Sequence, residues 1–341
     1  MNAILEPTLP VAVIEIIFGL VMLSYAADKF VDGAAAVARV ARISPVVVGA
    51  VIVGFGTSVP ELLVSGIAAS NGDLDLGVGN VVGSNVANLS LVLGTAAFIV
   101  PILATKSVVA KEVPLSLGAT VLFAIFTIGG LQRWEGIVML VTLAAMLTWT
   151  VMGSRAEDVV TDSDDEDDDE SSVVVNLGIT LIGLLGTVLG AQALVTGATT
   201  VADEAGLTGG FVGFTLVALG TSLPELVTAI VAARKGETDL IMGNLLGSNI
   251  FNSLAVGGAI SVLGAGPIGD ASIRTIGIIS MVAVGTVATV FIITRRRLHR
   301  VEAIVLLAIW LGTIALLAQN AKVDEQASVE QPAQVSSGHR L

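Results

Sequence analysis

A short motif that combines hydroxyl side chains with a carboxylate occurs twice in this chain. The sequence GTSVPEL spans positions 56–62, and GTSLPEL spans positions 220–226. Each motif is followed by a GNxxGSNxxN segment, so that every repeated position lies 164 residues from its counterpart. Between positions 56 and 88, 17 of 33 residues match their counterparts without a gap, which indicates an internal duplication.

The carboxylates of Glu61 and Glu225 are the first candidates for a working site, because charge buried in an apolar setting is costly and is usually kept for function. A spacing of four residues places Thr57 with Glu61, and Ser84 with Asn88, on one face of a helix. The second copy repeats the same spacing in the pairs Thr221 and Glu225, and Ser248 and Asn252.

These side chains offer only oxygen ligands, and no cysteine or histidine lies near them. Such a set suits hard cations, calcium and sodium, rather than zinc or copper. Two glutamates neutralise one calcium ion, and the same oxygens can be shared among several sodium ions. Pro60 and Pro224 are expected inside their helices, where proline would turn carbonyls near Gly56 and Gly220 toward a cavity. Antiport requires that two kinds of ion, here calcium and sodium, compete for one site.

Some of the repeated polar residues have a simpler structural interpretation. Asp75 and Asp239 each stand just before an apolar run, and we predict that they are helix N-caps. For four asparagines we favour a role in helix packing and interhelical hydrogen bonding, namely Asn80, Asn85, Asn244 and Asn249. For the four residues on the face that should meet the glutamates we favour an ion-binding role, namely Ser84, Ser248, Asn88 and Asn252.

The composition is that of a membrane protein. Hydrophobic residues make up 54% of the chain and charged residues 13%, with a mean hydropathy of +0.91. These values exclude an ordinary soluble globule, and the alternating short strands of a transmembrane barrel are absent. The absence of cysteine excludes disulfides and thiolate metal sites. We predict an all-α polytopic membrane protein with no cofactor and no nucleic acid partner.

Apolar runs bounded by glycine, proline and charge clusters predict ten membrane-spanning helices. The expected spans are 11–32, 44–70, 75–100, 112–130, 134–153, 173–200, 208–233, 239–264, 273–294 and 301–319. Each half then holds five spans, and an odd number reverses the orientation of the second half. We therefore expect two five-helix repeats of inverted topology, with a site at the midplane between them.

The predicted organisation follows from the duplication and from the charge distribution. Ten acids lie between Glu157 and Glu170, which concentrates much of the net charge of −13 in one segment. This run and the isoelectric point near 4.5 are compatible with a salt-loving prokaryote. The segments are a first repeat at 1–154 with its motif at 54–90, an acidic loop at 155–172, a second repeat at 173–320 with its motif at 218–254, and a disordered tail at 321–341.

The orientation follows from the lysines and arginines. With the N-terminus outside, eleven of them fall in the cytoplasmic connections and four on the outer side. The positive-inside rule then predicts that both termini are extracellular and that the acidic loop is cytoplasmic.

The motifs GTSVPE and GTSLPE, together with the paired GNxxGSNxxN segments, resemble the alpha repeats of the sodium/calcium exchanger family, and its prokaryotic members most closely. This family belongs to the calcium/cation antiporter superfamily. The resemblance implies ten helices in two inverted halves in the cell membrane. It also implies that sodium drives calcium across the bilayer by alternating access, with about three sodium ions exchanged per calcium ion.

The resemblance implies roles for individual residues as well. Glu61 and Glu225 would be ligands shared by calcium and sodium, and the carbonyls of Thr57 and Thr221 would complete the calcium site. The neighbouring hydroxyls are those of Ser58 and Ser222. The flanking sodium sites would use Ser84 and Ser248 with the carbonyls of Gly54 and Ala218, and the centre would be lined by Asn88 and Asn252.

Asn252 departs from several relatives, including potassium-dependent exchangers, which carry aspartate there. The missing charge leaves two central carboxylates and makes potassium co-transport the weaker interpretation. Proton coupling is weaker too, because proton/calcium exchangers usually have other glutamate-containing motifs in place of the GSN segments. A calcium-permeable channel lined by the two glutamates is a third alternative. We expect no enzymatic activity, because neither His299 nor His339 lies in a predicted span and no nucleophile motif occurs.

Overall fold

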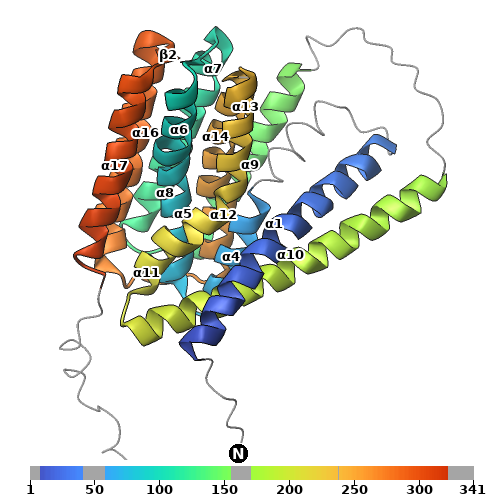
Figure 1. The fold of residues 1–341 in the computed structure, drawn as a ribbon, viewed down its shortest axis with the longest axis vertical. Helices are drawn as coiled ribbons and strands as arrows, with labels where there is room; N and C mark the ends of the chain where they lie inside the picture. Colours follow the sequence, from blue (N-terminus) through green and yellow to red (C-terminus); the bar gives the residue numbers. More distant parts are fainter. Residues whose placement is uncertain (1–7, 41–57, 155–169, 237, 322–341) are drawn as a thin grey trace, which may run out of the picture.

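The computed structural model describes residues 8–40, 58–154, 170–236 and 238–321, which form a helical bundle (Figure 1). The first half contains α1 (Leu9–Val40), α4 (Val59–Ser70), α5 (Leu74–Ala87), the π-helix η2 (Asn88–Val92), α6 (Leu93–Ile99), α7 (Lys106–Ala110), α8 (Glu112–Thr127) and α9 (Arg133–Ser154). The second half contains α10 (Glu170–Ala205), α11 (Gly209–Val212), η3 (Gly213–Val217), α12 (Ala218–Thr221), α13 (Leu223–Lys235), α14 (Thr238–Phe251), η4 (Asn252–Val256), α15 (Gly257–Leu263), η5 (Ile273–Gly277), α16 (Ile278–Arg295) and α17 (Arg300–Ala318). A two-stranded antiparallel sheet pairs β1 (Ile102–Leu103) with β2 (Arg297–Leu298).

Several of these helices are suited to crossing a membrane. Within the described ranges, seven helices are long and apolar enough, and the bent pair that ends in α13 makes an eighth. The predicted span 44–70 lies partly outside the described residues, and α4 is its described part. The predicted span 134–153 forms α9, which is not among the seven. The total of ten spans and the inverted repeats remain predictions.

The centre of the bundle is built from the two spans that carry the GNxxGSNxxN segments. In Leu74–Ile99 and in Thr238–Leu263, 78% of the most apolar stretch is buried, whereas the other five spans reach only 28–39%. The outer helices expose apolar side chains such as those of Ile14, Ile182 and Ile304, as expected for surfaces that face lipid. The polar residues of the two central spans are therefore held away from the bilayer.

The two longest helices, α1 and α10, pack against each other in antiparallel directions. Gly19 lies against Leu194, whereas Gly33, further along α1, lies against Thr180 at an earlier position of α10. A Cβ atom at Gly19 would lie 2.7 Å from the Leu194 nitrogen, and one at its repeat counterpart Gly183 would lie 2.5 Å from a backbone nitrogen of α1. Glycine thus lets the two backbones approach closely, as is common between helices in lipid.

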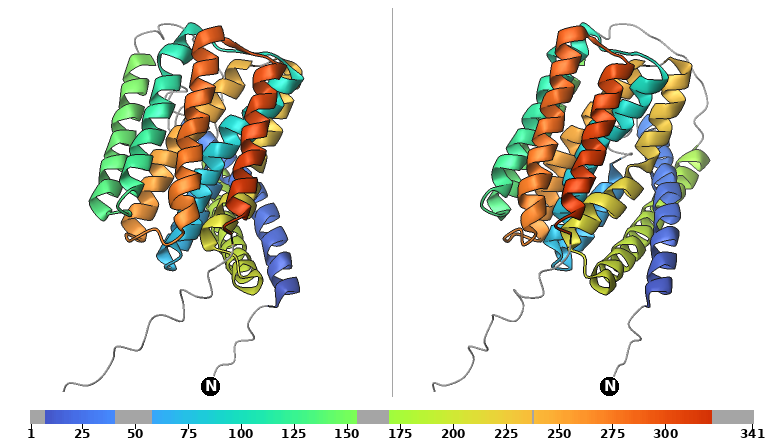
Figure 2. Two further views of the ribbon diagram at one scale, coloured as in Figure 1. Left: turned by 90° about the vertical axis from the view of Figure 1, so that its left-hand side faces the viewer. Right: turned by 60° about the vertical axis from the view of Figure 1, so that its left-hand side comes forward.

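The lengths of α1 and α10 affect how they fit a bilayer. Their 32 and 36 residues correspond to roughly 48 and 54 Å, which exceeds the ~30 Å of a hydrocarbon core. In Figure 1 both helices run obliquely to the upright bundle of α5, α14, α16 and α17, and Figure 2 shows the same pair standing beside the bundle. The tilt allows helices of this length to be accommodated in the membrane.

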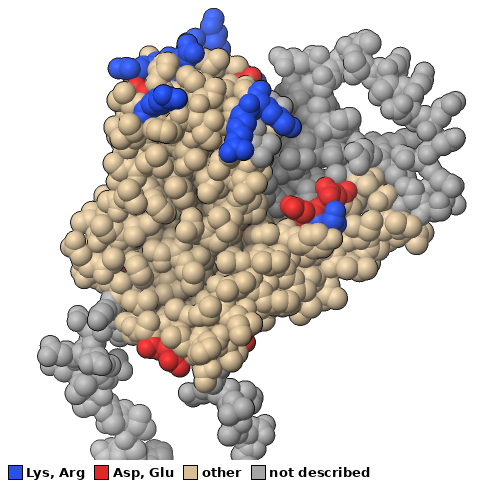
Figure 3. Space-filling model, in the orientation of Figure 1, with Lys and Arg blue, Asp and Glu red and all other residues tan. Residues whose placement is uncertain are grey.

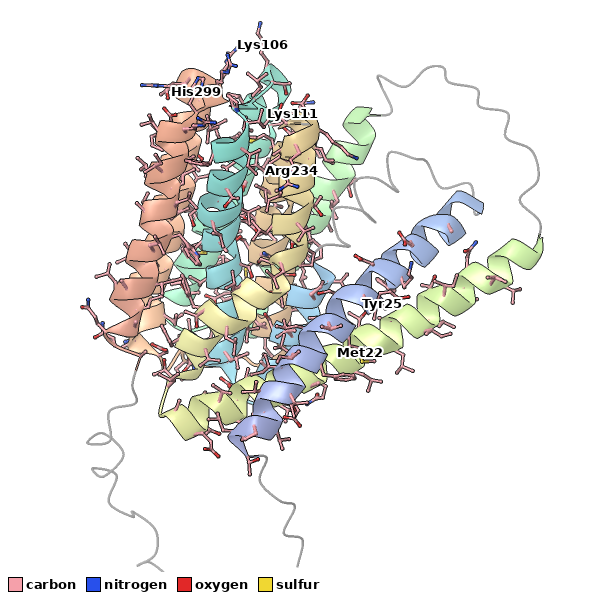
Figure 4. All side chains as sticks on the ribbon, in the orientation of Figure 1. Met22, Tyr25, Lys106, Lys111, Arg234 and His299 are labelled. Atoms are coloured by element: carbon pink, nitrogen blue, oxygen red, sulfur yellow. The ribbon has the colours of Figure 1, made fainter. Side chains whose placement is uncertain are left out.

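Basic side chains are concentrated at one end of the bundle. Lys and Arg side chains gather at the upper end in Figure 3, whereas acidic side chains appear at both ends and, beside a basic one, on the oblique part at the right. Lys106, Lys111 and Arg234, all from connections expected to be cytoplasmic, share the upper end in Figure 4. Helix α1 begins and α17 ends at the opposite end (Figure 1). This distribution agrees in pattern with the orientation expected from the positive-inside rule.

We expect Gly190→Ala to destabilise the protein, because the new Cβ would lie 2.6 Å from the Leu23 nitrogen across the α1–α10 interface. Overpacking of this kind costs about 1–3 kcal/mol. Gly178→Ala on the same helix is the matched control, since a Cβ there meets nothing within 4 Å. Thermal unfolding of the detergent-purified variants measures the difference, and equal melting temperatures would contradict the close packing.

Candidate ion-binding site

Each GTSxPE motif lies where a helix begins or breaks. Ser222 separates α12 from α13, and the two segments of this span meet at an angle of 42°. Ser58 precedes α4 with φ −97° and ψ 6°, nearly the same conformation as Ser222 with φ −88° and ψ 5°. Both lie in the sparsely populated bridge region in which many functional residues are found. The repeat therefore preserves a backbone conformation as well as a sequence.

The prolines lie at a different place from the one expected. Pro60 and Pro224 occupy the first turn of α4 and α13, so each of these helices begins just before its proline. The expectation that they sit inside their helices was wrong. Proline is tolerated at a helix start, where its missing N–H has no partner to lose, and its ring disfavours continuation of the preceding helix.

The two glutamates are fully buried, each with 0% of its surface exposed. Glu61 Oε1 accepts a hydrogen bond from Ser222 Oγ at 3.4 Å. The neighbouring Thr221 hydroxyl donates to Asn80 Oδ1 at 3.4 Å. The Glu61 and Glu225 carboxylates are close enough to interact electrostatically. The described ion pairs, Lys29–Asp32 and Arg295–Glu302, lie elsewhere. The carboxylates from the two halves of the chain thus meet at one buried site.

Several buried polar atoms of the repeated motifs have no hydrogen-bond partner. They include Ser58 Oγ, Glu61 Oε2, Ser84 Oγ and Asn88 Oδ1, and both polar side-chain atoms of Asn252. An unsatisfied buried polar group costs on the order of 1–3 kcal/mol. All but one of these atoms are oxygens, the ligands that calcium and sodium prefer. No cluster of three or more acidic, histidine or cysteine side chains suited to a metal occurs in the described part of the chain.

Two π-helical turns mark matching positions on the central spans. η2 begins at Asn88, and η4 begins at its repeat counterpart Asn252. π-helical turns are rare and are often found at functional sites, because the extra residue per turn shifts which side chains face inward. The asparagines at the end of each GNxxGSNxxN segment are thus at the point where the helix changes its winding.

Other amides of the repeated segments form a hydrogen-bonded network. Asn249 Nδ2 donates to the Asn85 carbonyl at 3.2 Å, and Asn249 Oδ1 accepts from Asn88 Nδ2 at 3.1 Å. Asn85 Nδ2 donates to Ser253 Oγ at 3.2 Å. Asn80 Nδ2 donates to Ser65 Oγ at 2.8 Å. The expected interhelical role of Asn80, Asn85 and Asn249 is confirmed, whereas the partners Ser65 and Ser253 carry no repeat signature that the sequence could reveal.

The structure describes ten of the twelve candidate residues, and all ten are buried. From the first half they are Ser58, Glu61, Ser84 and Asn88, and from the second half Ala218, Thr221, Ser222, Glu225, Ser248 and Asn252. Ala218 packs against the backbone at Gly83, beside Ser84. Gly54 and Thr57 lie outside the described residues.

The helix caps differ from the prediction for Asp75. Asp73 caps α5 by accepting from the Leu76 backbone N–H at 3.0 Å. Asp75 instead accepts from the backbone N–H groups of Gly269 at 2.8 Å and Asp270 at 3.0 Å. The N-cap prediction for Asp75 was therefore wrong, because the sequence DLD offers two aspartates and the helix begins after the first. Asp239 lies within the first turn of α14 and is exposed, so it is not the cap either.

A family model described as sodium/calcium exchanger protein matches residues 11–152 and 175–319. The chain belongs to the sodium/calcium exchanger family. It is 37% identical over 316 residues to a putative antiporter, CaxA, of Alkalimonas amylolytica, which covers 90% of this chain and 98% of that protein. It is 27% identical to the sodium/calcium exchanger MaX1 of Methanosarcina acetivorans, over 89% of this chain and 97% of that protein.

The fold supports the same conclusion. A solved structure of the sodium-calcium exchanger NCX_Mj superimposes with a TM-score of 0.63 at 30% identity, covering 90% of this chain and 99% of that one. This member of the exchanger family is thus a multi-pass transmembrane antiporter that resembles bacterial and archaeal relatives. The buried carboxylates lie within the matched segments.

We expect Asn249→Ala to lower stability by about 1–3 kcal/mol, because it removes two buried hydrogen bonds and leaves Asn88 Nδ2 without a partner. Asn252→Ala removes the same number of atoms from a neighbouring position but breaks no hydrogen bond. Asn252→Ala should therefore lower the stability much less than Asn249→Ala. Thermal unfolding in a buffer free of sodium and calcium compares the stability of the two variants. An equal loss of stability would contradict the assignment of Asn249 to the hydrogen-bonded network and of Asn252 to the ion site.

Proposed function

We propose that this protein exchanges sodium for calcium across the cell membrane, at one central site, with about three sodium ions per calcium ion. The observation that carries the proposal is the convergence of Glu61 and Glu225, one from each half, in a fully buried place lined by neutral oxygens. Two carboxylates balance one calcium ion. Sodium ions that replace it neutralise the same carboxylates.

The charge balance accounts for the coupling. A site emptied of cations would leave two negative charges buried without compensation, which is costly in a low-dielectric interior. No basic side chain pairs with Glu61 among the ion pairs of the described residues. The protein therefore changes between its inward-open and outward-open states when either calcium or sodium is bound, and only slowly when the site is empty.

The proposed ligands follow the repeated motif. Glu61 and Glu225 bind both ions, and the Thr57 and Thr221 carbonyls complete the calcium site. The remaining oxygens come from Ser58, Ser222, Ser84, Ser248, Asn88 and Asn252, and from the carbonyls of Gly54 and Ala218. Support comes from the buried atoms without partners at Ser58, Ser84, Asn88 and Asn252. Because Asn252 is neutral, potassium co-transport is the weaker alternative.

The proposed architecture is ten helices in two inverted five-helix repeats, at 1–154 and 173–320, with the acidic loop 155–172 in the cytoplasm and both termini outside. It is supported by the antiparallel packing of α1 and α10, which are counterparts in the duplication. It is also supported by the matching backbone conformations of Ser58 and Ser222. The basic side chains at one end of the bundle favour this orientation (Figure 3).

Calcium uptake into sodium-loaded vesicles should require an outward sodium gradient, because calcium and sodium compete for the same oxygens. Radiolabelled calcium measures the flux, and a proton gradient without sodium is the control. Uptake driven by the proton gradient alone would favour a proton-coupled exchanger. Calcium uptake that does not saturate as the calcium concentration rises, and that needs no counter-ion, would indicate a channel.

Glu61→Gln and Glu225→Gln should each reduce sodium-driven calcium uptake by roughly a hundredfold or more, because the loss of one buried charged partner costs about 3–5 kcal/mol. Glu204→Gln, an identical change at an exposed position at the end of α10, is the matched control and should transport normally. Near-normal uptake by either central variant, with comparable protein in the membrane, would refute the assignment.

A further inference from the structure

Asn80 connects the helices of the two GTSxPE motifs across the centre of the bundle. It lies on α5, which packs against both α4 and α12 (Figure 1). Helix α4 begins within the first motif, and α12 ends within the second. The Asn80 side chain is fully buried and is hydrogen-bonded at both ends of its amide. One side chain of α5 therefore contacts a helix of each motif.

The two hydrogen bonds of this amide have opposite polarity. Asn80 Nδ2 donates to Ser65 Oγ on α4 at 2.8 Å. Asn80 Oδ1 accepts from the Thr221 hydroxyl on α12 at 3.4 Å. An amide side chain has one donor end and one acceptor end, so the bond from Nδ2 to Ser65 leaves the oxygen facing Thr221. Ser65 thereby orients the group that receives the Thr221 hydroxyl.

Thr221 occupies a decisive position in the second motif. It is the last residue of α12, directly before the break at Ser222, and it is buried. Its hydroxyl also lies 3.4 Å from the carbonyl oxygen of Ala218 in its own helix. The bond to Asn80 joins this end of α12 to α5 and, through Ser65, to α4. The contact thus holds the residue whose carbonyl we propose as a calcium ligand.

A close approach of α4 and α5 accompanies the bond between Asn80 and Ser65. Gly77 lies three residues before Asn80, on the same face of α5. A Cβ atom at Gly77 would lie 3.1 Å from the backbone carbonyl oxygen of Ser65, which is tighter than most side-chain contacts. The glycine therefore lets the two helices approach closely beside the serine that the amide reaches.

The duplication does not account for this arrangement. Asn80 repeats as Asn244, but the counterpart of Ser65 is Ala229, whose side chain has no hydrogen-bonding atom. The counterpart of Gly77 is Ile241. The serine and the glycine thus occur together in the first half, and both are replaced in the second. The difference favours a role that is specific to the Thr221 side of the site.

From these contacts we infer that Ser65 and Asn80 are positioning residues for calcium binding. Ser65 orients the Asn80 amide, and the amide holds Thr221 where its carbonyl meets the ion. The inference rests on the proposed function, in which Thr221 provides a carbonyl to calcium and the flanking sodium sites use other carbonyls. The pair therefore sets the affinity for calcium more than the affinity for sodium.

Ser65→Ala removes the acceptor of the Asn80 amide and should raise the calcium KM of sodium-driven uptake roughly three- to tenfold, the range expected for one hydrogen bond. The sodium concentration that half-saturates exchange should stay nearly unchanged. Ser261→Ala is the matched control, because Ser261 is equally buried but donates to the Gly257 carbonyl within its own helix. Equal calcium KM values for the two variants, or an equal rise for both ions in Ser65→Ala, would overturn the inference.

A double-mutant cycle tests whether Ser65 acts through Thr221. Thr221→Val removes the hydroxyl but keeps the backbone carbonyl, and it should raise the calcium KM by itself. Adding Ser65→Ala to this variant should then raise the KM little further, because the contact is already lost. Effects of the two changes that multiply would overturn the inference. If Ser65→Ala fails to fold, Thr221→Val still decides, since an unchanged calcium KM in that variant contradicts the positioning role.

A binding measurement separates this inference from the exchange function. Equilibrium binding of radiolabelled calcium to the purified full-length protein should be weakened by Ser65→Ala and unaffected by Ser261→Ala. If the protein binds calcium with this pattern but exchanges none for sodium, the proposed function fails while the positioning role stands. If exchange is normal but Ser65→Ala binds calcium as tightly as the unmodified protein, the positioning role fails while the proposed function stands.

Discussion

The burial of two negative charges in an apolar membrane protein is the constraint on which the rest of this structure depends. Glu61 and Glu225 have no exposed surface, and they lie close enough to repel each other. Such a pair is tolerable only with a cation present or with a strongly polar surrounding. The helix break at Ser222 places the hydroxyl of Ser222 against the carboxylate of Glu61. The buried central helices α5 and α14 keep the other polar groups of the repeated motifs away from the bilayer.

The polar residues of the central helices divide into two physical classes. Asn80, Asn85 and Asn249 satisfy one another or neighbouring hydroxyls across helix boundaries, which fixes how the helices meet. Ser84 and Asn252 keep atoms without partners, although both are buried. Asn85 and Asn88 belong to both classes, since the side-chain nitrogen of each joins the network while its side-chain oxygen has no partner. A rigid amide network next to unsatisfied oxygens would hold a site open for ions without letting it collapse.

Much of this arrangement could be predicted from the sequence, because apolar runs bounded by charges mark helices well. The predicted spans 75–100 and 239–264 are shifted by one residue from the helices 74–99 and 238–263. The helix starts just before Pro60 and Pro224 were missed, since proline is compatible with both the interior of a kinked span and the start of a new helix. The π-helical turns were also missed, because a change from four to five residues per hydrogen-bonded turn leaves no periodic signature in so short a segment.

The paired π-helical turns at Asn88 and Asn252 also bear on the history of the chain. A π-helical turn within an α-helix amounts to one residue more than the regular winding requires, as if a single residue had been inserted. Here the extra residue falls at the same place in both halves, which are aligned without a gap over the whole motif. The simplest history is that the insertion happened once, in a half-length ancestor, and was copied with the rest. That ancestor already possessed the local irregularity now found in each half.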